Sequence, residues 1–193
     1  DEYYQQERDA LDEMEPEMDE VITEYYQALV NSQFRAQLEE KWGSQLFALA
    51  DNQIKVFSPA VIELMQKENK LVSEYNKLVA SAQIEFDGKT LTLAQLAPYG
   101  ESTDRAIRKA ARDTSANFFA QNGEKFDELY DQLVKIRHEI ATTVGYKNYV
   151  ELGYIHMNRV DYNAEMVAKF REQVREFIVP LVTKLYERQA KRI

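Results

Sequence analysis

The chain has 193 residues, enough for one substantial hydrophobic core or two small lobes. Its formal net charge of −9 argues against nucleic-acid partners, which need a basic surface, and no apolar run approaches the roughly 20 residues that span a bilayer. The absence of cysteine excludes disulfides and cysteine-ligated metals, and it favours the cytoplasm as the compartment. The composition, with only 6 Gly and 4 Pro, predicts an all-α fold.

The first half of the chain is expected to be helical. Apolar residues recur at three- and four-residue spacing from Tyr4 to Leu29, which predicts an amphipathic helix. Pro16 must either kink that helix or begin a second one. Ser58 and Pro59 form a helix start, with Ser58 as N-cap, and a long amphipathic helix is expected to follow.

A β-hairpin is expected in residues 84–91. Alternating residues flank Asp87-Gly88, and this dipeptide supplies the positive φ angles that a type I′ turn requires. One isolated hairpin is only marginally stable, so it must pack on helices. The predicted fold class is therefore all-α, with mainly antiparallel or orthogonally packed helices and this one small hairpin.

Three further helices are expected after the hairpin. Ser102 or Thr103 should cap the first of them, with Asp104 in its first turn. A second helix runs to Gly145, which fits the left-handed position just past a helix end. The last helix should begin after an N-cap at Asp161 or Asn163, and Pro180 must bend it.

Residues 145–162 form an aromatic-rich segment between the last two of these helices. It contains Tyr146, Tyr149 and Tyr154, together with His156, one of the two histidines of the chain. One interpretation is a packing hinge, because clustered aromatic side chains are usually buried. The other is a functional segment that faces a substrate.

No ordinary catalytic zinc site can be assembled from this sequence alone. A zinc peptidase helix needs His-Glu-x-x-His, but Thr142 follows His138-Glu139 where the second histidine should be. We therefore predict no metal ligands and no catalytic residues in this chain, and we interpret His138 as a surface or interhelical residue. A phosphate-binding glycine loop and a serine nucleophile elbow are also missing.

The order and length of the segments carry a family resemblance. The run from Arg137 to Ile193, the segment Glu101–Ala111 (ESTDRAIRKAA) and the hairpin before it resemble the region ahead of the catalytic domain in oligoendopeptidase F. That group belongs to the thimet-oligopeptidase-like M3 family of zinc metallopeptidases. The resemblance covers most of the chain and is strongest from about Ile84 onward.

This resemblance implies that the chain is the N-terminal portion of a cytoplasmic zinc oligoendopeptidase. Residues 1–193 would form a single helical unit, with an N-terminal lobe over about 1–100 and the first helices of the peptidase scaffold over 101–193. The zinc, its ligands and the glutamate general base would lie in a later part of the polypeptide. The chain begins without Met and ends inside a helical pattern, so we expect a piece of a longer protein that is inactive by itself.

The expected partners are short peptides and the C-terminal catalytic part of the same polypeptide, with no nucleic acid and no membrane. His156, Arg159 and Tyr162 are the candidates for facing the substrate cleft. Arginine can bind a peptide carboxylate with two parallel hydrogen bonds, and a tyrosine hydroxyl can donate to a carbonyl or an oxyanion. Alternatively, Arg159 pairs with Asp161 and Tyr162 only anchors the last helix. The alternative for the whole chain is a non-enzymatic helical interaction module.

Overall fold

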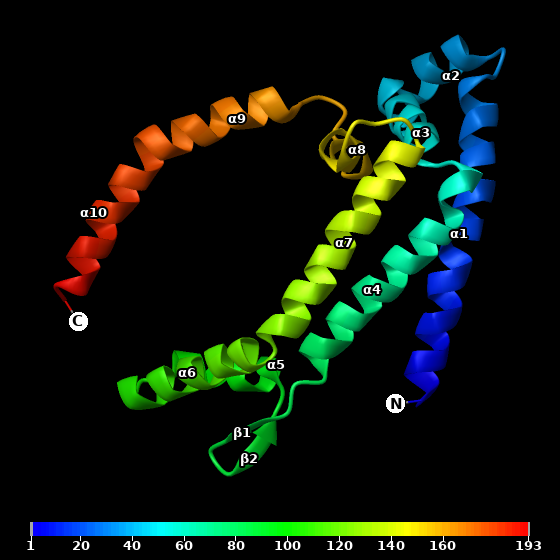
Figure 1. Cartoon of the computed structure of the whole chain (residues 1–193). Coiled ribbons are helices and arrows are strands. Elements are labelled where there is room, and N and C mark those ends of the chain that lie inside the picture. The colour runs from blue at the N-terminus through cyan, green and yellow to red at the C-terminus, as the bar shows by residue number, and fades with distance from the viewer. Residues whose placement is uncertain (1, 193) are drawn as a thin grey trace. The chain divides into compact units, whose positions relative to one another are not determined.

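The computed structural model describes residues 2–192 (Figure 1). The chain forms two compact units. Unit 1 contains residues 2–22 and 57–149, and unit 2 contains residues 23–56 and 150–192. Helices dominate both units, and the strands found in the described residues form one two-stranded antiparallel sheet. The predicted all-α class with one small hairpin is confirmed.

Unit 1 is built around two long antiparallel helices, α4 (Ile62–Ala80) and α7 (Gly123–Thr143), which pack side by side (Figure 1). The predicted start at Ser58 is confirmed: Ser58 Oγ accepts a hydrogen bond from the Ala60 N–H, and a 3₁₀ turn, η1 (Pro59–Val61), leads into α4. α7 buries one face whose residues recur at three- and four-residue spacing: Leu129, Leu133, Ile136, Ile140 and Ala141. Full burial of one such large side chain is worth about 1.5–3 kcal/mol, so this face anchors the unit.

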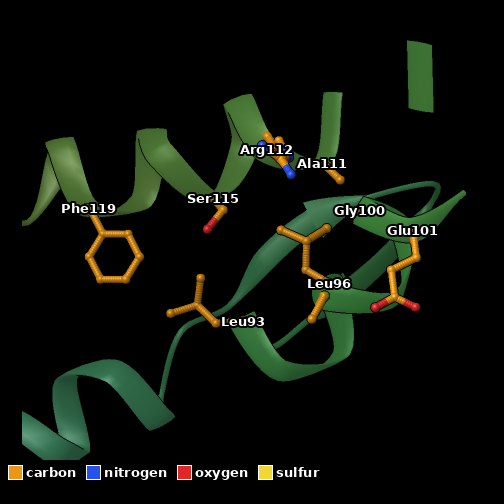
Figure 2. Close-up of a pocket in the computed structure, with 9 residues that line it drawn as sticks. Leu93, Leu96, Gly100, Glu101, Ala111, Arg112, Ser115 and Phe119 are labelled. Atoms are coloured by element: carbon orange, nitrogen blue, oxygen red, sulfur yellow. The ribbon is translucent and has the colours of Figure 1, made fainter. Parts of the chain in front are cut away.

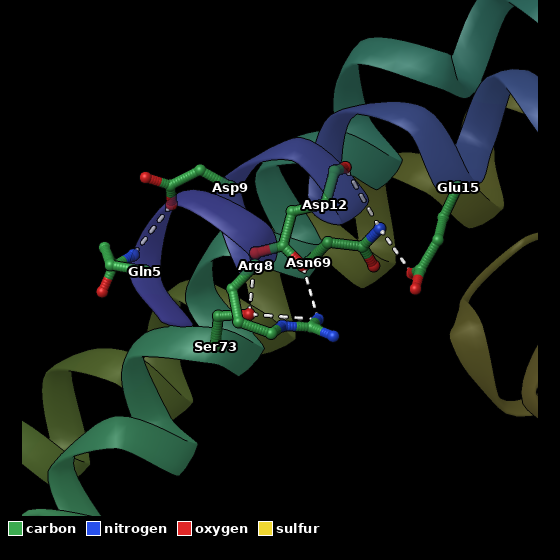
Figure 3. Close-up of polar contacts among 7 residues, drawn as sticks. All are labelled: Gln5, Arg8, Asp9, Asp12, Glu15, Asn69 and Ser73. Atoms are coloured by element: carbon green, nitrogen blue, oxygen red, sulfur yellow. Dashed lines mark hydrogen bonds and ion pairs between the residues drawn. The ribbon is translucent and has the colours of Figure 1, made fainter. Parts of the chain in front are cut away.

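Pro16 neither divides nor ends the first helix, because α1 runs from Glu2 to Val30 through it. Proline has no N–H, so the carbonyl of Asp12, four residues earlier, loses its helical donor. In the structure Asn69 Nδ2 of α4 donates to the Asp12 carbonyl at 3.4 Å (Figure 3). Gln66 Nε2 donates to the carbonyl of Glu13 at 2.9 Å. Backbone carbonyls of α1 near the proline therefore accept hydrogen bonds from side chains of α4.

The carboxylate of Asp12 lies at the same junction and is 1% exposed. It accepts a 2.6 Å ion-paired hydrogen bond from Arg8 and a 2.7 Å hydrogen bond from Ser73 Oγ of α4 (Figure 3). A buried charge is tolerated only when it is paired and hydrogen-bonded, and here both conditions hold. This cluster fixes the axial register of α1 on α4.

The predicted hairpin is present as β1 (Ile84–Phe86) and β2 (Lys89–Leu91), with Ile84 opposite Leu91. Asp87 and Gly88 have φ angles of 53° and 69°, which gives the two-residue turn its left-handed backbone. The hairpin contributes to a small core with the helices that follow it, formed by Ala82, Ile84, Leu96 and Ala111. The Phe86 ring packs edge-on against Tyr99, with 5.0 Å between centroids.

The chain then forms α5 (Leu93–Leu96), a 3₁₀ turn η2 (Ala97–Glu101) and α6 (Arg105–Gln121). The predicted cap of α6 at Ser102 or Thr103 is wrong by one or two positions. Asp104 is the N-cap, and its carboxylate accepts a 2.7 Å hydrogen bond from the Ala106 N–H. Ser102 Oγ instead accepts a hydrogen bond from the Asp104 N–H, so each of the two side chains accepts from the N–H two residues later.

Unit 2 contains the end of α1 together with α2 (Arg35–Trp42), α3 (Ser44–Val56), α8 (Tyr149–His156, whose first residue belongs to unit 1) and the C-terminal helical segment. Phe47, Ala50 and Leu152 are fully buried. Arg35 ties α2 to α3, since it pairs with Glu39 and Asp51 and its guanidinium lies 5.1 Å from the Phe47 ring centroid. The hydrogen bond that Arg35 donates to the Glu39 carboxylate is the main reason that the Arg35 pKa is raised.

The C-terminal helical segment consists of α9 (Ala164–Gln173), a π-helical turn η3 (Val174–Ile178) and α10 (Val179–Ala190). Asn163 is the N-cap of α9 and accepts from the Met166 N–H, which confirms one of the two predicted caps. The π turn directly precedes Pro180, and the Val179 N–H reaches back five residues to the Val174 carbonyl. The wider turn accommodates the missing N–H of Pro180 without ending the helix. Each helix within residues 2–192 is too short or too polar to cross a lipid bilayer.

Candidate functional site

Two helix-end motifs define residues 145–162. Gly145, with a φ of 94°, ends α7 in a Schellman motif: the Tyr146 N–H donates to the Ala141 carbonyl at 2.8 Å and the Gly145 N–H to Thr142. The predicted left-handed position of Gly145 is therefore confirmed. The chain turns sharply there and begins α8 four residues later.

A second Schellman motif ends α8, and Asn158 occupies its left-handed position with a φ of 52°. The Arg159 N–H donates to the Tyr154 carbonyl at 3.2 Å, and the Asn158 N–H donates to Ile155 at 2.8 Å. In this motif the side chain after the left-handed residue commonly contacts the one five positions earlier. The backbone thus brings Arg159 back over Tyr154.

The guanidinium of Arg159 contacts two tyrosine rings. Its central carbon is 4.4 Å from the ring centroid of Tyr154 and 5.4 Å from that of Tyr162. Such cation–π contacts are worth about 0.5–1 kcal/mol each at exposed sites and more where water is excluded. Arg159 is half-buried, whereas Tyr162 is 42% exposed, so the cluster reaches the surface.

The described residues offer Arg159 no carboxylate within ion-pair distance, so the alternative pairing with Asp161 is not formed. The cation–π contacts with Tyr154 and Tyr162 use none of the five N–H donors of the guanidinium as hydrogen bonds to a carboxylate. An arginine of this kind can bind a carboxylate with two parallel hydrogen bonds. The cluster therefore suits an anionic group.

The sequence-predicted residues are brought together only in part. Arg159 and Tyr162 form one cluster, and His156 is an exposed residue that ends α8. Tyr154, which the sequence treated as one of several packing aromatics, makes the shorter contact with Arg159. Its role was accessible in principle, because Asn158 favours the left-handed conformation that returns Arg159 to Tyr154.

A second polar cluster, which the sequence did not indicate, joins α4 and α7. Arg137 Nε donates a 2.6 Å hydrogen bond to Glu68 Oε1, and its guanidinium lies 5.7 Å from the Tyr149 ring centroid. Burial lowers the Arg137 pKa, but the hydrogen bond and the charge of Glu68 outweigh burial and raise it. Burial and the nearby Glu68 carboxylate raise the pKa of Tyr149, and Arg137 opposes that shift. Because Glu68 and Arg137 lie 69 positions apart, only the fold reveals this pair.

Unit 1 also contains a cavity of about 410 Å³ between α5, η2 and α6 (Figure 2). Leu93, Leu96 and Phe119 supply apolar lining, and Ser115 points into the space from α6 (Figure 2). Glu101 and Arg112 lie at its edge. Ala111 of α6 is buried and contributes to the lining of this cavity.

The described residues do not fit the zinc that the family resemblance implies. No group of three or more His, Asp or Glu side chains in residues 2–192 could hold a metal ion. His138 is exposed on α7, and Thr142, one helical turn later, donates to the His138 carbonyl where a second ligand would be needed. We therefore derive no catalytic step through a metal from this chain.

Comparisons with known proteins agree with the fold and the segment order. Residues 1–57 match the peptidase M3 N-terminal domain, and residues 98–193 match peptidase family M3. Three solved structures are similar over the whole of this chain: PZ peptidase A with inhibitor 2 (58% identity, TM-score 0.95), an oligoendopeptidase F (53%, 0.96) and an oligoendopeptidase F from Bacillus anthracis strain Ames (48%, 0.94). The comparison with curated proteins gave no match.

The chain spans 34%, 34% and 35% of these three structures, so it is about a third of their length. The family matches cover both ends of the sequence, and the structural likeness extends over all of it. The resemblance inferred from the hairpin, residues 101–111 and the run after Arg137 is confirmed. The chain belongs to peptidase family M3.

Proposed function

We propose that this chain is the N-terminal part of a zinc-dependent oligoendopeptidase that hydrolyses short peptides. The observation that carries the proposal is its likeness over all residues to PZ peptidase A and to two oligoendopeptidase F structures, each about three times longer. In this proposal the chain supplies scaffold and cleft wall and has no peptidase activity alone. Residues 1–100 would form the N-terminal lobe and residues 101–193 the first helices of the peptidase scaffold, in keeping with a family M3 match that begins at residue 98.

The zinc and the residues that activate water would come from the part of the polypeptide that this chain does not span. That remaining part and short peptide substrates are the proposed partners, and the cytoplasm is the proposed compartment, consistent with a sequence that has no cysteine. Zinc, when bound there, would polarise the scissile carbonyl.

Within this chain, the proposed contribution to substrate binding is Arg159. Its guanidinium makes cation–π contacts with Tyr154 and Tyr162 and has no carboxylate partner in the described residues. We propose that it binds the C-terminal carboxylate of a short peptide, with Tyr162 and His156 beside the same substrate. A preference for short peptides would follow, because a carboxylate at a fixed place limits how far the peptide can extend.

The test is a chimera in which this chain replaces the matching third of PZ peptidase A. We expect the 193-residue chain to hydrolyse no peptide, and the chimera to cleave a short fluorogenic peptide and to lose that activity with a zinc chelator. Added zinc should restore it. The control is a chimera whose His-Glu-x-x-His glutamate is changed to glutamine. A chimera that folds but cleaves nothing would favour the interaction-module alternative. One that works equally well with the chelator would contradict the zinc dependence.

A further inference from the structure

The cavity between α5, η2 and α6 has no role in the proposed function. All of its lining residues lie within residues 93–119 of unit 1, so one short stretch of the chain forms it (Figure 2). Its volume of about 410 Å³ falls within the range of about 300–1,000 Å³ that is usual for small-molecule sites. Leu96 and Ala111 belong both to its wall and to the small core beside the hairpin. Packing therefore fixes the wall before any ligand binds.

The turn between η2 and α6 brings two opposite charges to this cavity. Glu101 is the last residue of η2 and Arg112 lies in the middle of α6, and both line the space. Arg108 fixes the turn, because its Nη1 donates to the Ser102 carbonyl at 2.6 Å and to the Thr103 carbonyl at 3.0 Å. Within residues 2–192 the side chains of Glu101 and Arg112 pair neither with each other nor with another residue. Both charges are therefore available to a ligand.

Ser115 adds an uncharged polar group to the same cavity. Its side chain points from α6 into a space that Leu93 and Phe119 also line (Figure 2). A serine inside a helix usually points out to solvent or bonds the carbonyl four residues earlier. The part of the chain that the structure describes gives the Ser115 hydroxyl no hydrogen-bond partner. A hydroxyl both donates and accepts, so it suits an amide of a ligand.

We propose that this cavity binds a dipeptide with apolar side chains and free termini. Arg112 binds the terminal carboxylate, to which a guanidinium can donate two parallel hydrogen bonds. Glu101 binds the terminal ammonium group, and Ser115 bonds the central amide. The apolar side chains of the dipeptide contact Leu93 and Phe119. This assignment goes beyond the proposed function, because binding needs neither zinc nor hydrolysis.

Other occupants leave polar groups of the cavity without partners. An apolar carboxylic acid would pair with Arg112 but would bring no cation to Glu101. An apolar side chain from another polypeptide segment would cover the Ser115 hydroxyl without bonding it, which is unfavourable. In a free amino acid both charges are attached to one carbon, whereas Glu101 and Arg112 do not approach each other closely enough to pair. A dipeptide has its charges at opposite ends.

Isothermal titration calorimetry of the 193-residue chain with leucyl-leucine tests the two charges. The chain should bind leucyl-leucine at least about tenfold more tightly than its C-terminal amide, and Arg112→Gln should remove that preference. Glu101→Gln should likewise remove the preference over N-acetyl-leucyl-leucine. Arg105→Gln is the matched control, because Arg105 is an exposed arginine of α6 outside the cavity lining, and both preferences should remain.

A second pair of variants tests the cavity itself. Ser115→Leu fills the space and should abolish binding. Ala116→Leu adds the same side chain at the next position, outside the lining, and should leave the affinity unchanged. Thermal melting checks the fold of each variant. Glu101 and Arg112 are exposed, so their variants should melt like the parent even if Ser115→Leu does not.

Three results with the 193-residue chain would overturn the proposal: no binding of leucyl-leucine at millimolar concentration, octanoate binding as tightly as the dipeptide, or terminal preferences that survive Arg112→Gln and Glu101→Gln. The titration is then repeated with the PZ peptidase A chimera, which should bind the dipeptide with a similar affinity. Binding to the 193-residue chain that is lost in the chimera would also overturn the proposal, because the remaining polypeptide would then occupy the cavity.

Discussion

At the scale of single residues, the buried carboxylate of Asp12 shows how a charge can hold two helices in register. It is 1% exposed and accepts hydrogen bonds from Arg8 on its own helix and from Ser73 on α4. In sequence Asp12 directly precedes an acidic run, from Glu13 to Glu20, that is typical of a solvated face. Its burial depends on Ser73, 61 positions away, so the local pattern could not reveal it.

Asp12→Ala should lower the free energy of unfolding by about 2–3 kcal/mol, because hydrogen bonds to a charged group are the strong ones and Ser73 loses its acceptor. Asp9→Ala is the matched control: Asp9 is an exposed aspartate on the same helix, and its loss should cost within about 0.5 kcal/mol. Urea unfolding followed by circular dichroism measures both. Equal costs would show that the buried carboxylate contributes nothing beyond an ordinary surface residue.

Arg159 is the opposite case, because its environment is almost entirely local. The left-handed Asn158 and the hydrogen bond from the Arg159 N–H to the Tyr154 carbonyl bring the guanidinium to the ring. The sequence could thus predict Arg159 and Tyr162 as neighbours across a turn. It could not decide between Tyr154 and Asp161 as the partner of Arg159, since both lie within five residues.

At the scale of elements, two prolines occur inside helices and are accommodated differently. Pro16 leaves the Asp12 carbonyl to Asn69 of α4, so the lost helical bond becomes an interhelical one. Pro180 is preceded by a π turn, so its helix adjusts internally. The position of a proline in the sequence does not distinguish these outcomes, because they depend on whether a hydrogen-bond donor from another helix is close enough to the freed carbonyl.

A double-mutant cycle tests the first of these accounts. Asn69→Ala should cost about 1–2 kcal/mol in the natural sequence, because the buried Asp12 carbonyl loses its donor. In a Pro16→Ala background the cost should fall by at least about 0.5 kcal/mol, since the new N–H of residue 16 can satisfy that carbonyl. Chemical unfolding of the four proteins gives the coupling. Additive costs would mean that Asn69 stabilises α1 in some way unrelated to Pro16.

Elements with strong local signals were predictable. The Asp87-Gly88 turn, the Ser58 cap and the Gly145 helix end all follow from side chains that favour one backbone conformation. The predicted N-cap of α6 was misplaced because Ser102, Thr103 and Asp104 are consecutive, and each of these side chains can accept a hydrogen bond from an N–H at the start of a helix. Which one does so depends on where η2 ends.

At the scale of the whole molecule, the chain is a member of peptidase family M3 that spans about a third of the similar structures. The order of segments in the sequence predicted this family. The hairpin, residues 101–111 and the run from Arg137 were sufficient for this prediction, although none of them contains a catalytic motif. In the proposed function, the chain contributes scaffold and substrate contacts to a larger enzyme.

The most direct measurement compares one short peptide with a free C-terminal carboxylate and the same peptide as an amide, using the PZ peptidase A chimera. Arg159→Ala should lower kcat/KM for the free acid by at least about tenfold, which corresponds to about 1.4 kcal/mol, and should change the amide little. The melting temperature should stay close to that of the parent, and Asp161→Ala should leave both substrates unaffected. A surface arginine of purely structural value would be worth only about 0–1 kcal/mol of stability. Unchanged kcat/KM for both substrates, with a lowered melting temperature, would contradict the account.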